Sequence, residues 1–283
     1  MNADSFFTIG STHQVCEDYA LSGETGEASF AVMSDGCSGA PRTDFGARFL
    51  SLAMEQILRI PDLRTAVNSL HISGLELAER MLREMMEMSQ LQITCLDATL
   101  GYVFADGDYL RVFLAGDGAI AARKRNGDKW CAIVDYPSGA PPYLSYGLDE
   151  DRTQYFLDQT NGCPFTIDMF ESSRKGMKLE EYNSSTVEDS GMHSHFFMFP
   201  RDEYDLAMVM SDGICTFQKP KNGETAKYFE DVHAASIISD LLNVKSSKGE
   251  FIKRRCRRIV KNLCTKDGWR HLDDFSVAAI YDG

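Results

Sequence analysis

One pentapeptide occurs twice in the chain, and each copy carries an acidic residue followed by glycine. Val-Met-Ser-Asp-Gly covers residues 32–36 and recurs at residues 209–213. An apolar run precedes each copy, so Asp35 and Asp212 are expected at the ends of buried strands, where the backbone holds a side chain in place. The glycine permits a tight turn and can direct its own carbonyl toward the same point. The repeat therefore predicts two firmly positioned carboxylates.

Two further acidic pairs could join these carboxylates. Glu17 and Asp18 lie near the start of the chain, and Asp273 and Asp274 directly precede its last apolar run. Oxygen ligands of this kind suit Mg²⁺ or Mn²⁺ better than Zn²⁺, and a divalent cation relieves the repulsion among neighbouring carboxylates. The alternative is that each Asp-Gly pair is only a turn, since Asp-Gly is a common hairpin sequence.

Other phosphate chemistries fit the sequence less well. Cys264 and Arg270 have the spacing that a cysteine phosphatase needs, but the residues between them do not form a glycine-rich loop for phosphate. Cys37 and Arg42 miss that spacing by one residue. The Asp-Gly-Asp sequence at residues 106–108 continues into an alternating strand pattern and is interpreted as a hairpin turn.

The elements that would position these residues form separate groups of strands and helices. Apolar residues at helical spacing predict helices over residues 41–60, 62–90 and 249–264. Apolar runs bounded by turn signals predict strands over residues 28–34, 98–105, 108–115, 119–125, 129–134, 205–211 and 275–281. Antiparallel strand groups with helices in separate blocks indicate an α+β layered fold rather than alternating βαβ units.

The chain contains no linker that would divide it, so we expect a single domain over residues 1–283. Residues 147–204 are the least regular part. Within them, residues 171–193 are rich in Ser, Lys, Glu and Gly, which is typical of an exposed flap. This segment precedes the strand that delivers Asp212, so we expect the flap near the substrate.

Composition excludes several classes of protein. The chain has 283 residues and a formal net charge of −13, and its 43% hydrophobic content is sufficient for a large core. The acidic balance argues against a nucleic-acid surface. There is no apolar run of about 18 residues that could span a membrane, and residues 1–10 lack the basic region of a signal peptide. Eight scattered cysteines without a Cys-x-x-Cys pair indicate reduced thiols in a cytoplasmic protein.

Six short motifs in one order resemble those of the metal-dependent protein phosphatases, the type 2C serine/threonine phosphatases, and in particular their bacterial members. These motifs cover residues 16–19, 34–39, 98–99, 115–118, 210–214 and 273–277. The resemblance runs from about residue 10 to residue 281 and is weakest over residues 140–204. It implies a four-layer αββα sandwich of two packed antiparallel sheets flanked by antiparallel helix pairs, in agreement with the layered fold predicted above.

The resemblance also implies a set of metal ligands. Asp35 matches the aspartate that bridges two metal ions, and Gly36 matches the glycine whose carbonyl binds one of them. Asp212 and Asp273 match the other carboxylate ligands. Asp117 matches an aspartate that serves a weaker third ion together with the Asp212 position.

Near the start of the chain the match is less complete. Glu17 and Asp18 match the acidic pair that holds water around the metal ions. Animal members have a phosphate-holding arginine where this chain has His13, and a histidine where it has Cys37. We therefore expect His13 to take part in catalysis, whereas the group that replaces the histidine stays open.

The implied activity is removal of phosphate from phosphoserine and phosphothreonine of proteins by a water molecule that Mg²⁺ or Mn²⁺ activates. Its expected catalytic residues are Asp35, Asp212, Asp273 and His13. Two alternatives stay open, namely a catalytically weak relative that binds phosphoproteins and a phosphatase of small phosphorylated metabolites. The expected partner is a phosphorylated protein, with no nucleic acid or membrane, and the chain is expected to be a cytoplasmic monomer in signalling.

Overall fold

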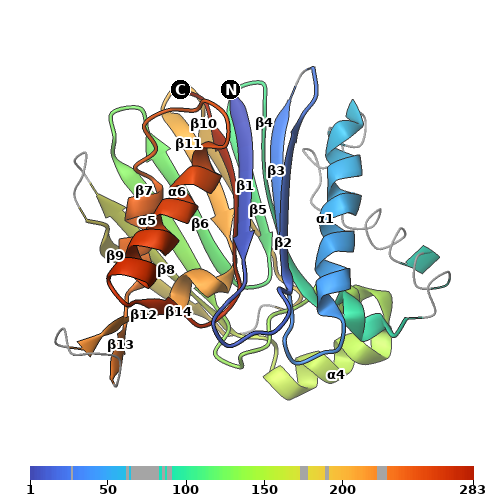
Figure 1. The fold of residues 1–283 in the computed structure, drawn as a ribbon. Helices are drawn as coiled ribbons and strands as arrows, with labels where there is room; N and C mark the ends of the chain where they lie inside the picture. The colour runs from blue at the N-terminus through green and yellow to red at the C-terminus, as the bar shows by residue number, and fades with distance from the viewer. Residues whose placement is uncertain are drawn as a thin grey trace.

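Two antiparallel β-sheets pack face to face at the centre of the molecule, with helices on their outer faces (Figure 1). The computed structural model describes residues 1–283 apart from residues 27, 62–63, 65–82, 85–86, 88–90, 173–177, 189–190 and 222–227. This arrangement confirms the predicted α+β fold with two packed sheets.

In the described part of the chain, the larger sheet has seven strands and the smaller one has five. The larger sheet consists, in spatial order, of β1 (Asn2–Thr8), β15 (Phe275–Tyr281), β11 (Tyr204–Met210), β6 (Gly118–Lys124), β7 (Lys129–Asp135), β8 (Phe165–Ser172) and β9 (Glu180–Val187). The smaller sheet consists of β10 (His195–Pro200), β5 (Tyr109–Ala115), β4 (Ala98–Asp106), β3 (Ser29–Gly36) and β2 (Asp18–Glu24). A further small sheet contains β13 (Phe229–Asp231), β12 (Phe217–Pro220) and β14 (Arg270–His271).

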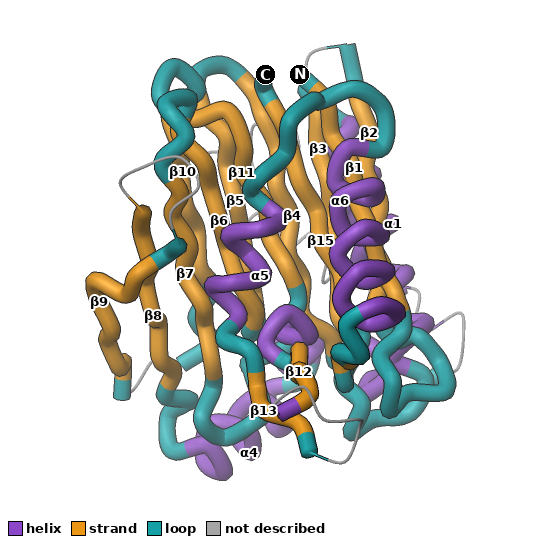
Figure 2. The backbone as a smooth tube through the Cα atoms, turned by 60° about the vertical axis from the view of Figure 1, so that its left-hand side comes forward, coloured by secondary structure: helices purple, strands orange, loops and turns teal. Residues whose placement is uncertain are grey.

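Helices cover both outer faces, as the second view also shows (Figure 2). α1 (Thr43–Arg59) packs against β3 and β2. α5 (Ala234–Leu241) and α6 (Phe251–Val260) cover the seven-stranded sheet, and α4 (Glu150–Thr160) packs beside the 3₁₀ turn η2 (Leu144–Leu148). The helix predicted over residues 62–90 lies largely outside the described residues. No helix within the described ranges is both long enough and apolar enough to cross a membrane.

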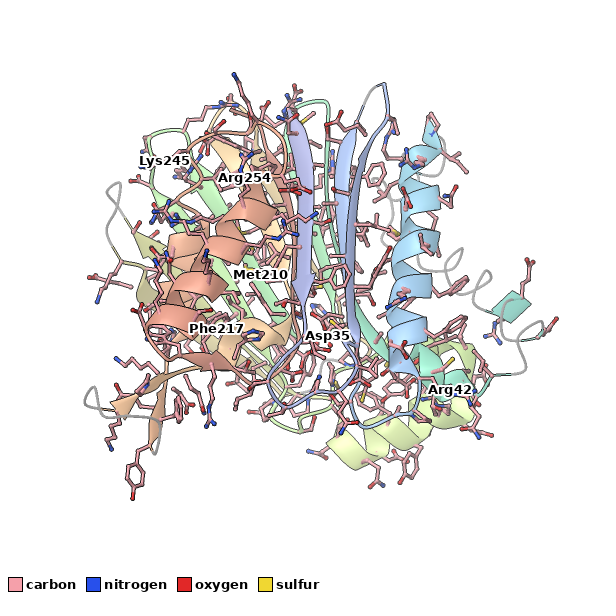
Figure 3. All side chains as sticks on the ribbon, viewed as in Figure 1. Asp35, Arg42, Met210, Phe217, Lys245 and Arg254 are labelled. Carbon is pink, nitrogen blue, oxygen red and sulfur yellow. The ribbon has the colours of Figure 1, made fainter. Side chains whose placement is uncertain are left out.

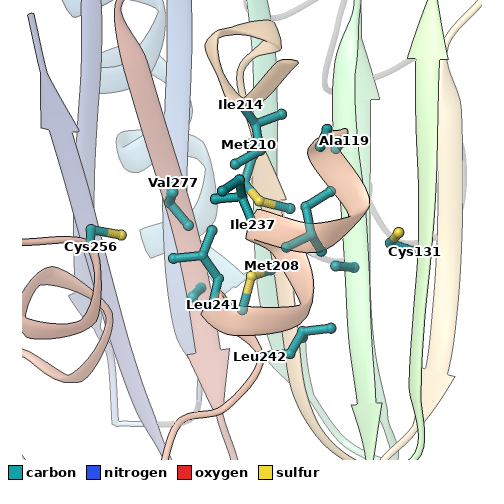
Figure 4. Packing of buried hydrophobic residues seen from close by; sticks show 14 of the residues in the cluster. Ala119, Cys131, Met208, Met210, Ile214, Ile237, Leu241, Leu242, Cys256 and Val277 are labelled. Carbon is teal, nitrogen blue, oxygen red and sulfur yellow. The ribbon is translucent and has the colours of Figure 1, made fainter. Parts of the chain in front are cut away.

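Strand β11 explains why the apolar runs of the sequence form the inner strands. Successive side chains of a strand point to opposite faces. Ala207 and Val209 therefore belong to the apolar cluster between the sheets, whereas Met208 and Met210 belong to the cluster beneath α5 and α6 (Figure 4). All four side chains are fully buried, so a strand with both faces covered has to be apolar throughout.

The predicted strands and two of the predicted helices are confirmed with small shifts at their ends. Residues 147–204, the least regular part by sequence, contain α4, β8, β9 and β10. β9 lies within the predicted flap at residues 171–193, where it forms an edge strand whose residues are all exposed. Residues 173–177 and 189–190 of that segment lie outside the described residues.

Candidate metal centre

Acidic side chains gather at one end of the β-sandwich because several strands begin or end there. In the smaller sheet, Asp18 at the start of β2 pairs with Asp35 near the end of β3. In the larger sheet, β11 ends at Met210, and Asp212 opens the following 3₁₀ turn η3 (Asp212–Cys215). Asp273 lies two residues before β15, which pairs with β11. Asp35 lies at the lower end of the sandwich in Figure 3.

Asp18, Asp35 and Asp212 form the centre of this group, with Asp18 buried and the other two partly buried. Burial raises the pKa of Asp35 well above its usual range, and the charges of Asp18 and Asp212 raise it further. Burial likewise raises the pKa of Asp18 to about 7. The pKa of Asp212 is raised to about 6 by burial and by the charge of Asp273. A nearby positive charge would stabilise the ionised form of these carboxylates.

Asp117 joins the group from a tight turn in the larger sheet. It follows Gly116, whose φ of 110° is unfavourable for any residue with a Cβ atom. The Thr99 hydroxyl donates a hydrogen bond of 3.1 Å to Oδ1 of Asp117 and fixes its orientation. Burial and the charge of Asp212 raise the pKa of Asp117 to about 7. The charges of Asp117 and Asp212 are thus close enough to influence each other.

One oxygen of Asp18 provides a test of whether a cation fits here. The Ser211 hydroxyl donates a hydrogen bond of 2.8 Å to Oδ2 of Asp18. The other oxygen, Oδ1, is buried and has no hydrogen-bond partner in the described part of the chain. A buried carboxylate oxygen that faces other carboxylates is costly unless a positive charge pairs with it. The donor set therefore fits a hard divalent cation.

The carboxylates are neighbours without forming a complete metal site. Among the residues that the structure describes, no group of three or more acidic, histidine or cysteine side chains has the geometry of a metal-ligand set.

Gly36 and Glu17 link the acidic group to the start of α1. The Gly36 amide donates a hydrogen bond of 3.2 Å to the Glu17 carbonyl. The Thr43 hydroxyl donates one of 3.0 Å to Oε1 of Glu17. A Cβ atom on Gly36 would lie 2.8 Å from the backbone carbon of Thr43, so only glycine permits this close approach of helix and strand.

His13 lies beside the acidic residues that precede β15. Its Nε2 is 3.3 Å from Oδ1 of Asp273, and its Nδ1 is 3.2 Å from Oδ2 of Asp274. Burial acts to lower the pKa of His13, but the contact with Asp274 and the charges of Asp273 and Glu17 outweigh it and raise the pKa. His13 thus lies partly buried at the edge of the acidic group, and its acidic neighbours favour its protonated form.

Asp274 has a structural role that the sequence does not reveal. Its side chain is 1% exposed. Its Oδ1 accepts a hydrogen bond of 2.7 Å from the Gly10 amide, and its Oδ2 accepts one of 2.5 Å from the Glu17 amide. Both oxygens are therefore occupied in joining residues 10–17 to the start of β15. Sequence reasoning placed Asp274 among the candidate ligands, whereas the structure makes it the residue that positions His13 and Glu17.

Sequence reasoning also missed Ser211 and Asp135. Ser211 contacts Asp18 and also accepts a hydrogen bond of 2.9 Å from the Ser276 amide. Asp135 ends β7, and its charge contributes to the raised pKa of Asp117 and of Asp212. A signal for Asp135 was present, because it ends an apolar strand as Asp35 does.

Comparison with known proteins shows which family and which folds this chain resembles. Residues 10–135 match the family model of protein phosphatase 2C. The fold resembles that of the S. agalactiae serine/threonine phosphatase, with a TM-score of 0.57, 14% identity and 99% of both chains covered. It also resembles serine/threonine phosphatase Stp1 from Staphylococcus aureus, with a TM-score of 0.54, 12% identity, and 99% of this chain and 95% of that chain covered. No curated protein matches the sequence.

The layered fold and the acidic strand ends define a protein with the architecture of the bacterial serine/threonine phosphatases. Residues 10–135 thus resemble the protein phosphatase 2C family, and the fold extends that resemblance to the whole chain.

Proposed function

We propose that this chain is a Mg²⁺- or Mn²⁺-dependent phosphatase that removes phosphate from phosphoserine and phosphothreonine of proteins. The observation that carries the proposal is the group of Asp18, Asp35 and Asp212 at one end of the sandwich, whose pKa values are all raised. Such a group is unfavourable without a cation and would hold one firmly. The match of residues 10–135 to the protein phosphatase 2C family model supports the reaction type.

Each acidic residue has a place in this proposal. Asp35, Asp212, Asp273 and the Gly36 carbonyl would hold two cations, Glu17 and Asp18 would accept hydrogen bonds from the surrounding water, and Asp117 with Asp212 would hold a third cation. When bound, the cations supply a water nucleophile at neutral pH and neutralise phosphate charge. The protein's own contribution is to position and orient, because phosphoryl transfer needs electrostatic stabilisation more than a covalent partner.

His13 is the proposed contact to the phosphate group. Its raised pKa favours the imidazolium form, and its neighbours Asp273 and Asp274 hold the ring at the edge of the acidic group. A cation at this point would attract a phosphate oxygen and offer it a charge-assisted hydrogen bond. We expect replacement of His13 by glutamine to raise KM more than it lowers kcat.

We propose that residues 1–283 act as one phosphatase domain with a flap at residues 171–193. β1 pairs with β15, so the two ends of the chain share one sheet. In the flap, Val187 of β9 pairs with Phe165, at the end of the sheet where Asp135 lies. Removing residues 188–193 should change the preference among phosphopeptides more than it changes cation affinity.

The eight cysteines are all free thiols in the structure, which supports a reducing, cytoplasmic location.

The test is hydrolysis of an aryl phosphate, a phosphothreonine peptide and a sugar phosphate, each with Mn²⁺, with Mg²⁺ and with EDTA. We expect cation-dependent release of phosphate from the peptide and the aryl ester. The matched control for Asp35→Asn is Asp202→Asn, because Asp202 is an exposed aspartate that precedes the other end of β11. Activity that survives EDTA, or no activity with either cation, would contradict the proposal. Hydrolysis of the sugar phosphate alone would indicate a metabolite phosphatase, and peptide binding without turnover a binding module.

A further inference from the structure

A basic cavity lies at the end of the seven-stranded sheet opposite the acidic group. β6 begins at Gly118, directly after Asp117, and reaches Arg123 and Lys124 at its other end. At about 3.3 Å per residue, the strand separates the two regions by roughly 20 Å. Figure 3 shows the same separation, with Lys245 at the upper end of the molecule and Asp35 at the lower end.

The charge of this cavity is opposite to that of the chain as a whole. The cavity has a volume of about 610 Å³, which is within the range of small-molecule sites. Its lining contains one acidic residue, Asp205. The cationic residues in the lining are Arg123, Lys124, Arg125, Lys129, Lys245 and Arg255. In a chain with a net charge of −13, so many cations in one cavity indicate an anionic ligand.

Arg123 makes the cavity wall rigid. Its guanidinium forms a two-pronged ion pair with Asp205, with both N–O distances at 2.9 Å. Its Nη1 also donates to the carbonyls of Leu242 and Val244, at 2.8 and 2.7 Å. These contacts fix the segment that follows α5, and Lys245 extends from that segment as an exposed cation. Asp205 is therefore paired with Arg123, and Arg125 is paired at 2.9 Å with Asp282, which lies outside the lining. Neither carboxylate pairs with Lys124, Lys129, Lys245 or Arg255.

Lys129 is a buried ammonium without an acidic partner. Lys129 is only 3% exposed. Its Nζ donates hydrogen bonds to the carbonyl and to the hydroxyl of Ser239, both at 2.9 Å. Within the described ranges no carboxylate pairs with it at 4.0 Å or less. Burial lowers the pKa of Lys129, and the charges of Arg123 and Arg255 add to the effect against the opposing charge of Asp240. An ammonium has three donors, so one is left for a ligand.

Arg255 completes the cationic group from α6. Its Nε donates to the Asp240 carbonyl at 2.7 Å, whereas its Nη2 is 3.9 Å from Oδ1 of Asp240. The Asp240 side chain is 61% exposed, so this long ion pair is screened by solvent. Most of the guanidinium donors of Arg255 are therefore available to an anion in the cavity.

We propose that this cavity binds a small, multiply charged phosphate compound, with Lys129, Lys245 and Arg255 contacting its phosphate oxygens. Ammonium and guanidinium groups form charge-assisted hydrogen bonds with phosphate, and such a ligand would supply the negative charge that Lys129 lacks. The site is distinct from the acidic group and does not depend on the proposed phosphatase activity.

The experiment is calorimetric titration of the full chain with inorganic pyrophosphate and, separately, with ATP. EDTA and constant ionic strength keep cations and simple screening out of the comparison. We expect saturable binding that weakens by about tenfold in Lys245→Gln and in Arg255→Gln, since each loses a charge-assisted hydrogen bond. Lys219→Gln is the matched control, because Lys219 lies on β12, away from the cavity lining, and its variant also loses one positive charge. The control should bind as the wild type does.

The two ligands distinguish the source of the phosphate groups. Equal affinity for both would show that phosphate alone is recognised, and tighter binding of ATP would add a contact to the nucleoside. If neither ligand gives saturable heat, or if Lys245→Gln and Arg255→Gln both bind as the wild type does, the proposal is wrong. Thermal unfolding of each variant checks that a loss of binding does not come from misfolding. A further variant, Lys129→Met, removes the buried charge and should also lose binding.

Discussion

Burial of neighbouring carboxylates makes the metal-free chain sensitive to pH. The pKa of Asp18 is raised to about 7 and that of Asp212 to about 6, in both cases mainly by burial. An unfolded carboxyl titrates near pH 4, so between about pH 4 and pH 7 the folded chain binds more protons at these groups than the unfolded chain does. Their stabilising contribution is therefore lost as the pH rises. We expect the free energy of unfolding in EDTA to fall by roughly a few kcal/mol between pH 5 and pH 8, measured by urea denaturation.

A variant separates this effect from other titrations. Burial lowers the pKa of His195 to about 4, which acts in the opposite direction, because the unfolded imidazole holds its proton up to about pH 6.5. The difference between the wild type and Asp35→Asn cancels the contribution of His195. The decline with pH should be smaller in Asp35→Asn, and equal slopes in the two proteins would contradict the electrostatic interpretation.

Loss of one central carboxylate should separate stability from activity. Asp35→Asn and Asp212→Asn each remove a negative charge from a buried, mutually repelling group. We expect turnover with Mn²⁺ to fall by at least about a thousandfold, while the metal-free chain gains roughly 1–3 kcal/mol in its free energy of unfolding. Steady-state kinetics and urea denaturation measure the two effects. Normal turnover in either variant would rule out its assigned role, and Asp202→Asn should change neither quantity.

Among the elements, residues 10–17 are joined to the residues that precede β15 in part by one buried side chain, that of Asp274. Asp274 accepts hydrogen bonds from the backbone amides of Gly10 and Glu17. Asp274→Ala would leave two amides without partners and should cost about 2–4 kcal/mol in unfolding free energy. Asp274→Asn keeps one acceptor oxygen and should cost less. If Asp274→Ala unfolds at the same urea concentration as the wild type, the contact does not hold the segment.

The sequence predicts the inner strands well and the outer ones poorly, for a physical reason. β11 has both faces covered, so its residues form a continuous apolar run that is visible in the sequence. β9 is exposed at every residue, and its polar sequence becomes a strand only because β8 offers an open edge. β1 contains a buried aspartate, Asp4, which accepts hydrogen bonds from the Ile252 and Lys253 amides at the start of α6. Such a contact between distant segments has no local signal.

The candidate site divides in the same way. Asp18, Asp35 and Asp212 could be predicted as one cluster because acidic residues at strand ends are firmly positioned, whereas Asp117 was predicted only from the family resemblance. The hydroxyl groups that orient these carboxylates could not be predicted from the sequence. Ser211 reaches Asp18 across 193 positions of sequence, a separation that only the folded chain bridges.

At the scale of the whole molecule, cation binding should appear as stability. A ligand that binds only the folded state adds about 2.7 kcal/mol at one hundred times its dissociation constant. We expect Mn²⁺ to raise the midpoint of thermal unfolding of the wild type in a concentration-dependent way, and to have little effect on Asp35→Asn. Scanning calorimetry at pH 7.5 measures this directly. Equal shifts in the two proteins would indicate that Mn²⁺ binds elsewhere.

The pairing of β1 with β15 has a consequence for how the protein is made. β15 lies between β1 and β11, so residues 275–281 occupy an inner position of the larger sheet. A nascent chain that has not yet reached these residues leaves the edges of β1 and β11 unpaired, and open edges of this kind invite association with other chains. Pairing between strands as far apart in the sequence as β1 and β15 slows folding. Asp273 and Asp274 directly precede β15 and are therefore also made late. The growing polypeptide therefore cannot assemble its acidic centre until synthesis has passed residue 281, which makes its late folding stage the point where a chaperone would matter most.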